Sequence, residues 1–174
     1  MAATERRAYS TADLEQRVTE IEIRPMSEAD VEPGLELVMK VFAEFVAPDL
    51  RPAGVASFAK WADPTAFAER LRGGHRALAA VHGGRIVGVV EWMPPAHVAM
   101  LFVDAAMQGE GVGQRLFEAG LRQIRATRQD VKTVGVHASR YAVPFYRRLG
   151  FRALAPEQEQ DGIRYTPMLL VLEE

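Results

Sequence analysis

The sequence predicts a single α/β domain with a mixed sheet, and three observations lead to this fold class. Short apolar strand patterns alternate with helical ones, and His82-Gly83-Gly84 between two strand patterns is typical of a hairpin. The apolar run Val98–Val103 passes through a glycine-spaced turn into a long helix. The chain of 174 residues also has the length of one domain with a full core, and it carries no internal repeat.

The first elements are a strand and two helices. Residues 21–25 alternate between apolar and polar until a proline interrupts them. Ser27 has the residue type of a helix N-cap. The helix after it carries apolar side chains at three- and four-residue spacing: Val31, Leu35, Val38, Phe42 and Phe45. Residues 49–64 follow no regular pattern, because prolines and a glycine punctuate them, and a second helix is expected over Thr65–Leu71.

The rest of the chain continues to alternate. Strands are expected over Ala77–Val81, Arg85–Met93, Val98–Val103, Val131–Ala138 and Met168–Leu172, with another beginning at Phe151–Leu154. Helices are expected over Gly111–Arg128 and Ala142–Leu149. Pro144 falls in the first turn of the latter helix, where a missing N–H costs little, and Gly150 suits its C-terminal cap. Asp161-Gly162 marks a turn before the last strand.

Three alternating glycines, Gly109, Gly111 and Gly113, separate the strand Val98–Val103 from the long helix. Glycine allows positive φ and lets another group approach the backbone amides closely. A helix N-terminus leaves four N–H groups without helical partners and carries about half a positive charge. The segment therefore predicts an anion site, and a phosphate or pyrophosphate is the ligand that fits it best.

The residues around these glycines exclude two common phosphate motifs. A dinucleotide fingerprint needs Gly-x-Gly-x-x-Gly, but its third position holds Gln114. A P-loop ends in Gly-Lys-Ser/Thr, but Gly113 is followed by Gln114 and Arg115. The remaining pattern, Gln108-x-x-Gly111-x-Gly113 after Leu-Phe-Val-Asp, resembles the acetyl-CoA-binding motif of GNAT-type N-acetyltransferases. A glycine-rich connection without a ligand is the alternative for this segment alone.

A second segment strengthens the resemblance. Residues 139–151 read Ser-Arg-Tyr-Ala-Val-Pro-Phe-Tyr-Arg-Arg-Leu-Gly-Phe, which is similar to the GNAT signature in which a polar residue, usually Asn, precedes Ala-x-x-Phe-Tyr-x-x-Leu-Gly-Phe. The two segments follow the family's order and separation over about residues 21–172. The resemblance implies one domain over 21–174, with a mixed, mostly antiparallel sheet of about six to seven strands and about four helices. Residues 1–20 are expected to be an N-terminal extension, flexible or a short helix.

The resemblance also implies which residues contact acetyl-CoA. In the family, the strand before the glycine turn binds the pantetheine arm through its backbone, and the turn holds the phosphates. The positions carried over are Leu101, Phe102, Val103, Gln108, Gly109, Gly111, Val112, Gly113, Gln114, Ser139 and Tyr146. Ser139 departs from the family's Asn, because a hydroxyl is shorter and lacks the amide's fork.

Acyl transfer from a thioester needs a neutral nucleophile and a stabilised leaving thiolate. A lysine-like amine has a pKa of about 10.4, so roughly one molecule in 2,500 is neutral at pH 7, and a base must remove a proton. Glu91, in an otherwise apolar strand, is the first candidate for the base, and His97 is the next. His137 is expected to be structural. Tyr146 matches the family's Phe-Tyr tyrosine, which implies a general acid for the thiolate; a core tyrosine is the alternative.

Composition excludes several functional classes. The chain has no cysteine, and its four histidines lack metal-ligand spacing, so neither a cysteine nucleophile nor a metal is expected. A net charge of −2 gives no reason to expect nucleic acid or an anionic membrane. No run approaches the roughly 18 apolar residues of a membrane span, and the N-terminus has no apolar signal-peptide core. We therefore expect a cytoplasmic protein.

The acceptor is not identified by the sequence. Aromatic side chains occupy the two-helix region that lines acceptor sites in the family: Phe42, Phe45, Phe58, Trp61 and Phe67. A small amine, an amino acid, an aminoglycoside-like compound and a protein N-terminus all stay open, and so does a homodimer. Two other functions also stay open. A non-catalytic acyl-CoA-binding module is disfavoured by the intact Phe-Tyr pair, and an unrelated nucleotide-binding enzyme is disfavoured by Gln114.

Overall fold

The computed structural model describes residues 10–12, 16 and 20–173. Within these residues eight strands form one sheet in the order β1-β2-β3-β4-β5-β8-β6, and β7 pairs with β8. The strands are β1 (Glu22–Pro25), β2 (Arg76–His82), β3 (Arg85–Met93), β4 (His97–Val103), β5 (Thr133–Ala138), β6 (Arg152–Ala153), β7 (Gln158–Gln160) and β8 (Ile163–Val171). Every pair is antiparallel except β4 with β5, so the predicted mixed, mostly antiparallel sheet is confirmed.

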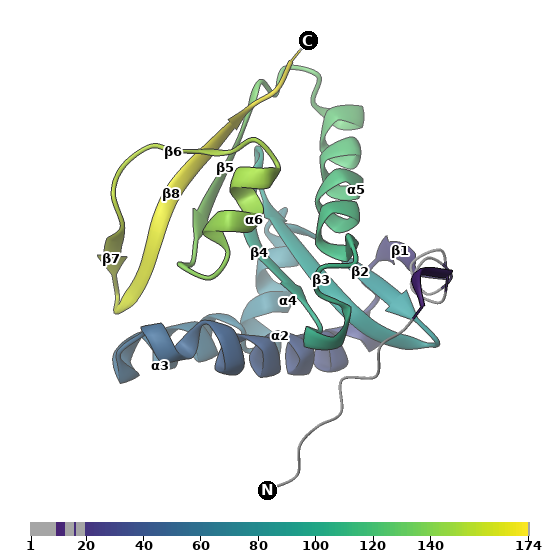
Figure 1. Ribbon diagram of the computed structural model, residues 1–174, viewed down its shortest axis with the longest axis horizontal. Coiled ribbons are helices and arrows are strands. Elements are labelled where there is room, and N and C mark those ends of the chain that lie inside the picture. The colour runs from purple at the N-terminus through teal and green to yellow at the C-terminus, as the bar shows by residue number, and fades with distance from the viewer. Residues whose placement is uncertain (1–9, 13–15, 17–19, 174) are drawn as a thin grey trace, which may run out of the picture.

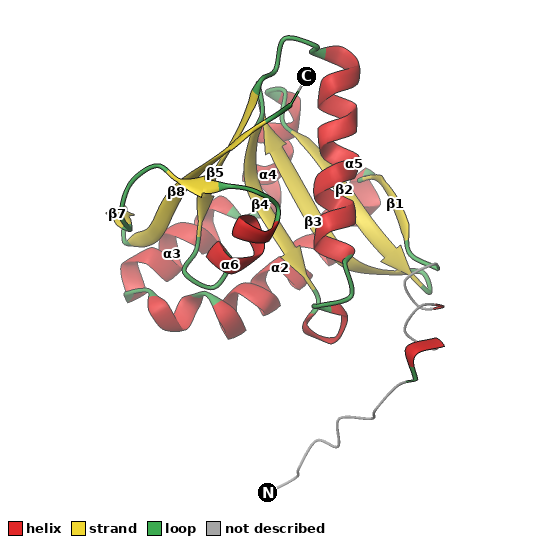
Figure 2. Ribbon diagram, turned by 45° about the horizontal axis from the view of Figure 1, so that its top comes forward, coloured by secondary structure: helices red, strands yellow, loops and turns green. Residues whose placement is uncertain are grey.

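In the described part of the chain, five α-helices cover the two faces of this sheet. They are α2 (Val31–Phe45), α3 (Pro52–Trp61), α4 (Pro64–Arg72), α5 (Val112–Thr127) and α6 (Val143–Arg148). Helices α2, α3 and α4 lie on one face, and α5 and α6 lie on the other (Figures 1 and 2). Short 3-10 turns at Glu28–Asp30, Ala47–Asp49 and Ala105–Met107 complete the connections. The sheet therefore has a separate apolar core on each side.

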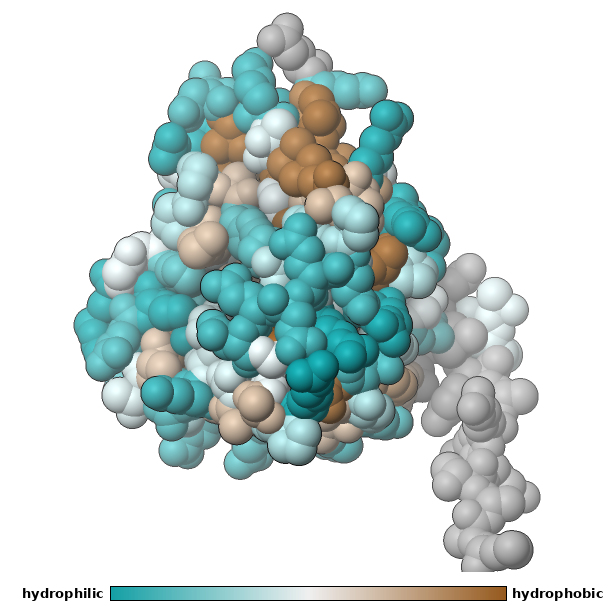
Figure 3. Space-filling view, turned by 90° about the vertical axis from the view of Figure 1, so that its left-hand side faces the viewer, coloured by the Kyte–Doolittle hydropathy of each residue, from teal (hydrophilic) through white to brown (hydrophobic). Residues whose placement is uncertain are grey.

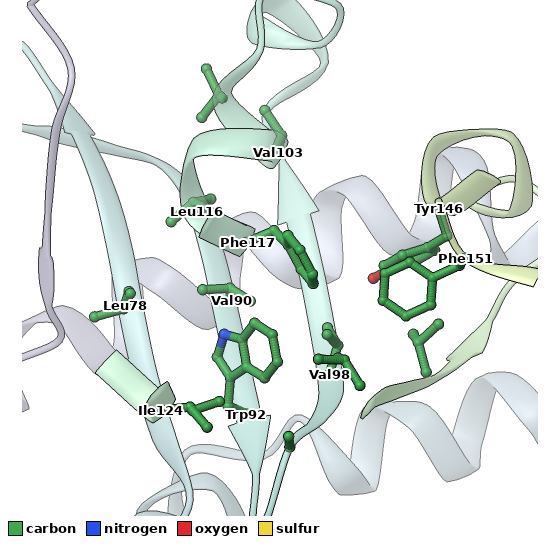
Figure 4. Packing of buried hydrophobic residues seen from close by; sticks show 14 of the residues in the cluster. Leu78, Val90, Trp92, Val98, Val103, Leu116, Phe117, Ile124, Tyr146 and Phe151 are labelled. Atoms are coloured by element: carbon green, nitrogen blue, oxygen red, sulfur yellow. The ribbon is translucent and has the colours of Figure 1, made fainter. Parts of the chain in front are cut away.

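The core on the α5 and α6 face contains the largest cluster of buried side chains (Figure 4). Trp92 of β3 packs there against Phe117 of α5, with ring centroids 5.4 Å apart. Gly120 of α5 permits this close packing, because a Cβ at that position would lie 2.0 Å from the indole Nε1 of Trp92. The indole N–H has no hydrogen-bond partner among the described residues. The core on the other face is formed by α2, α4 and the sheet: Leu35, Leu37, Val38, Val41, Phe67, Ala77, Val89 and Met100.

The structure corrects one expectation for the N-terminal half. Residues 49–64, expected to be irregular, contain helix α3. Pro52 occupies its first turn, where proline is tolerated, and Gly54 is needed because a Cβ there would lie 2.0 Å from the carbonyl oxygen of Gly162. The expected extension over residues 1–20 lies mostly outside the described residues.

Two surface properties complete the description. Figure 3 views the molecule from the side of β7 and β8, and this face is mostly hydrophilic, with hydrophobic residues gathered toward its top. Leu154, just after β6, and Val171, at the end of β8, are large apolar side chains that are 64% and 68% exposed. In the chain from residue 20 to 173 we find no helix with the length and hydropathy needed to traverse a bilayer.

Candidate active site

A cleft begins where the parallel strands β4 and β5 separate. The two strands pair only through His97 and Val98 of β4. In the β3–β4 ladder, Val98 and Met100 pair with adjacent residues of β3, so Ala99 between them is an extra residue that forms a bulge in β4. Such a bulge bends and twists a strand. From there to Val103, the edge of β4 that faces β5 has no strand partner in the described chain. An extended ligand can therefore bind to the backbone of β4 along this edge.

The cleft has a volume of about 1200 Å³ and passes between the two strands. One end is lined by the glycine turn and α6, and the other by side chains of α2, α3 and β8. It brings together all the residues to which the sequence assigns coenzyme contacts: Leu101, Phe102, Val103, Gln108, Gly109, Gly111, Val112, Gly113, Gln114, Ser139 and Tyr146. Glu91, the predicted base, is not among the residues that line it.

The glycine turn has the geometry of an anion site. Gly109 and Gly111 have φ of 81° and 79°, and a Cβ at either position would meet no atom within 4 Å. Gly111 is the N-cap of α5, and no side chain of the described residues caps this helix N-terminus. The first N–H groups of α5 therefore point outward without a side-chain acceptor. Gly113 also has a packing role, because a Cβ at this position would lie 3.1 Å from Phe145 of α6.

Gln108 crosses the mouth of the cleft. Its Nε2 donates a hydrogen bond to the carbonyl of Val103 over 3.0 Å, and its Oε1 accepts one from the hydroxyl of Tyr141. The ring of Tyr141 stacks on Phe45 of α2, with centroids 4.7 Å apart. Tyr141 was not singled out from the sequence, because its partners lie 33 and 96 positions away and no local pattern signals them. Gln108 therefore connects β4 to the β5–α6 loop.

Ser139 and Arg115 are both engaged within the protein. The Ser139 hydroxyl accepts a hydrogen bond from the N–H of Ala142 over 3.2 Å, at the turn that leads into α6. Its own O–H is still able to donate toward the cleft. The guanidinium of Arg115, which follows the glycine turn, donates to the carbonyl of Ile21 over 2.8 Å. Arg115 thus ties α5 to the start of β1.

Tyr146 of α6 is 4% exposed and lines the cleft. Its ring packs edge-on against Phe145 and Phe151, with centroids 5.0 and 5.2 Å away. Figure 4 shows the hydroxyl oxygen pointing toward the strand that carries Val98 and Val103. Within the described residues no hydrogen bond reaches this hydroxyl, and burial raises the pKa of the phenol above its usual value of 10.0. The hydroxyl is therefore a neutral donor directed at the cleft.

Glu91 of β3 is fully buried on the face covered by α2 and α4. Arg70 of α4 binds both of its oxygens, with Nε–Oε1 and Nη2–Oε2 distances of 2.8 and 3.1 Å. His75 Nδ1 lies 2.7 Å from Oε1. Arg70 also donates to the carbonyl of Trp61 over 2.6 Å, and its guanidinium lies 3.7 Å from the centre of that indole. Glu91 thus holds the α3–α4 junction, and its position does not favour the role of a base in the cleft.

Aromatic side chains line the cleft on the α2 and α3 face. Phe58 of α3 stacks on Phe42 of α2 with centroids 3.9 Å apart, and it lies 5.7 Å from Phe102 of β4. Trp61 also lines this part of the cleft. Phe67, which the sequence places in the same region, is fully buried in the core and is not among the lining residues. The wall of the cleft formed by α2 and α3 is therefore apolar and lined by aromatic rings.

Two histidines meet at the point where the strands separate. His97 of β4 and His137 of β5 contact each other edge to face, with centroids 5.0 Å apart. His137 also stacks on Tyr165 of β8 at 4.1 Å, and both of these residues line the cleft. Burial lowers the pKa of both imidazoles, and the neighbouring His137 lowers the pKa of His97 further by charge repulsion. Both rings are therefore neutral at pH 7.

Comparison with known proteins agrees with this geometry. A family model described as an acetyltransferase (GNAT) domain matches residues 46–172. No curated protein sequence gives a significant match.

Many solved structures share the fold, and three illustrate the range. A GCN5-related N-acetyltransferase from Rhodopseudomonas palustris is 25% identical, with a TM-score of 0.73, over 87% of this chain and 95% of its own. The PaiA N-acetyltransferase from Thermoplasma acidophilum, solved with coenzyme A, is 15% identical, with a TM-score of 0.71 over 87% and 99% of the two chains. A GNAT acetyltransferase from Staphylococcus aureus Mu50 is 15% identical, with a TM-score of 0.69 over 88% and 99%.

Proposed function

Because this chain belongs to the acetyltransferase (GNAT) domain family, we propose that it transfers the acetyl group of acetyl-CoA to a primary amine, with Tyr146 as the general acid. The observation that carries the proposal is the Tyr146 hydroxyl, which has no hydrogen-bond partner among the described residues and is directed at the cleft that the glycine turn also lines. A pure binding module would not need that donor. This favours an enzyme over a non-catalytic acyl-CoA-binding protein.

The residues present fit the coenzyme. The open glycine turn supplies N–H groups of Val112, Gly113 and Gln114 for phosphate oxygens, where the helix dipole also favours negative charge. The edge of β4 from Leu101 to Val103, which no described strand pairs with on the β5 side, supplies backbone groups for the amides of the pantetheine arm. When bound, acetyl-CoA supplies an activated acyl carbon with a thiolate leaving group.

Different residues of the chain then have different roles in the transfer. The β4 edge orients the thioester beside the gap, so that the amine can attack from the α2 and α3 face. Tyr146 gives its proton to the departing sulfur from the other face. A neutral phenol suits this role, and its raised pKa keeps it protonated throughout the neutral range. The apolar cleft limits the water that would compete with the amine.

Steady-state release of coenzyme A thiol, measured against a panel of primary amines, tests the proposal. We expect thiol release that depends on both acetyl-CoA and the amine, with the acetylated amine identified by mass spectrometry. Tight coenzyme A binding without amine-dependent thiol release would instead support the binding module.

The acceptor side favours a monoamine with an apolar or aromatic body. Among the described residues that line the cleft, Asp161 is the sole acid, whereas Lys60, Arg148 and Arg164 are cationic. A polycation would meet repulsion there, and an aromatic body would gain roughly 0.5–1.5 kcal/mol from each well-placed ring. We expect kcat/KM for 2-phenylethylamine to exceed that for spermidine at least about tenfold. Equal values, or a preference for spermidine, would contradict this.

The glycine turn yields a test of coenzyme binding. Replacing Gly111 by Glu forces a side chain into φ of 79° and places a carboxylate beside the anion site. Isothermal titration calorimetry is expected to show at least about a tenfold loss of coenzyme A affinity.

Gly84→Glu is the matched control for the glycine turn. Gly84 has φ of 75° and equally open space, but it lies in the β2–β3 hairpin. The two variants should lose similar thermal stability, and Gly84→Glu should retain coenzyme affinity. Wild-type affinity in folded Gly111→Glu would refute the phosphate site.

A further inference from the structure

The side chain of His137 points to the part of the cleft lined by α2 and α3, because side chains along β5 alternate between the two faces of the sheet. Val134, Val136 and Ala138 on this strand are buried in the core under α5 and α6. Successive side chains of a strand point to opposite faces, so His137 points to the face of α2 and α3. It lies one residue beyond the last pairing of β5 with β4, and it lines the cleft.

The ring of His137 is positioned by stacking but has its nitrogens available. Tyr165 holds one face of the imidazole at 4.1 Å and 19°, and His97 contacts it at 86°. Within the described residues, no hydrogen bond or ion pair reaches its nitrogens. His75 differs because it is bound to Glu91, and His82 differs because it lies 3.7 Å from Glu20. His97 also has no hydrogen bond within the described residues, but it is not among the residues that line the cleft. A neutral imidazole with an available lone pair is able to accept a proton.

The cleft thus has a proton donor on one face of the sheet and a proton acceptor on the other. Tyr146 belongs to the α5 and α6 face, and His137 to the α2 and α3 face where the aromatic wall lies. We propose that His137 is the general base that removes the proton from the acceptor amine. This inference rests on the proposed acetyltransferase function and assigns the base that Glu91 is not placed to supply.

The proton balance of the step is complete. An ammonium group loses two protons on acetylation. His137 accepts the first from the bound ammonium and holds it while the nitrogen attacks the acyl carbon. The carbon–nitrogen bond forms, the carbon–sulfur bond breaks, and Tyr146 gives its proton to sulfur. The second nitrogen proton then passes through water to the phenolate of Tyr146, and His137 releases the first proton to solvent. No oxidant, reductant or metal takes part in this step.

Several ionisable groups share the surroundings of His137. His97 of β4 and Tyr165 of β8 touch its ring. The charged groups lining the same cleft are Lys60, Arg148, Asp161 and Arg164. The lowered pKa of the His137 imidazole is caused by desolvation. The acidic limb of the kcat/KM profile is therefore expected below pH 6.5, the usual pKa of the group.

The test compares His137→Gln with wild type, using 2-phenylethylamine as the probe. Wild-type kcat/KM, per total amine, should be flat from about pH 7 up to the pKa of the amine, because His137 deprotonates the bound ammonium. In His137→Gln the value at pH 7 should fall about a hundredfold and then rise about tenfold per pH unit, because only neutral amine reacts. Coenzyme A affinity should stay within about twofold, since His137 lies on the other face.

Two further variants make the test specific. His97→Gln should retain the flat profile, and His82→Gln in the hairpin is the control for the substitution itself. A flat profile in His137→Gln, or loss of the plateau only in His97→Gln, would overturn the assignment. Wild-type protein that binds coenzyme A but acetylates no amine would overturn the proposed function and this inference with it. A normal wild-type rate with an unaffected His137→Gln overturns the inference alone.

Discussion

Replacing Tyr146 by phenylalanine is expected to lower kcat by about 10²–10⁴, the usual effect of losing an acid catalyst. This corresponds to a barrier increase of roughly 2.7–5.4 kcal/mol. The substitution removes one hydroxyl and retains the ring that packs between Phe145 and Phe151. Since no hydrogen bond holds the hydroxyl within the described residues, little stability should be lost with it. The expected loss is therefore confined to the chemical step.

Pre-steady-state measurement of thiol release distinguishes the possible outcomes. The rate of the first turnover should fall by the same factor as kcat, which excludes product release as the cause. The melting temperature and coenzyme A affinity should match those of wild type. Because burial raises the phenol pKa, no basic limb from Tyr146 should appear below about pH 10 in the wild-type profile. Near-normal single-turnover rates in Tyr146→Phe would refute the general acid, and a change mainly in KM would place the residue on the acceptor side.

Features set by neighbouring residues could be predicted from the sequence. The positive φ of Gly109 and Gly111 and the start of α5 depend on a few adjacent positions, so the motif located them correctly. The β2–β3 hairpin is local in the same sense. Gly113 is different, because its contact with Phe145 joins residues 32 positions apart. The sequence shows that position 113 holds a glycine, but it does not show that this glycine packs against Phe145.

Helix α3 and Glu91 show why other parts could not be predicted. Pro52 and Gly54 resemble chain breakers, but the first lies where a helix tolerates proline and the second fits against Gly162, more than 100 residues later. For Glu91, strand alternation implies only that it faces away from Val90. That Arg70 and His75 meet it there depends on how α4 docks on the sheet.

His137 illustrates the same limit at the site. The alternation of β5 predicts that it points opposite to Val136 and Ala138. Which face receives the acceptor depends on where α2 and α3 pack, and the stacking partner Tyr165 comes from another strand. From the sequence, His97 is the second candidate for the base and His137 is expected to be structural, so the proposal for His137 depends on the tertiary structure.

Loss of the Glu91 carboxylate is expected to produce the largest change in stability. Glu91→Gln should lower the free energy of unfolding by about 3–5 kcal/mol, because it leaves the guanidinium of Arg70 without its buried charged partner. Glu69→Gln is the matched control on the same helix. Its side chain is exposed, and it should change stability by less than about 0.5 kcal/mol.

Chemical denaturation of Glu91→Gln tests this, and a double-mutant cycle of Glu91→Met, Arg70→Met and Glu91→Met/Arg70→Met measures the coupling of the pair. The double variant should be more stable than Glu91→Gln, because it removes both buried charges together. Since Arg70 also anchors Trp61 in the aromatic wall, KM for the amine should rise in Glu91→Gln. The plateau of kcat/KM above about pH 7 should nevertheless persist, because His137 is intact. Unchanged stability together with loss of that plateau would show that Glu91 acts in the cleft after all, and that its pair with Arg70 opens during turnover.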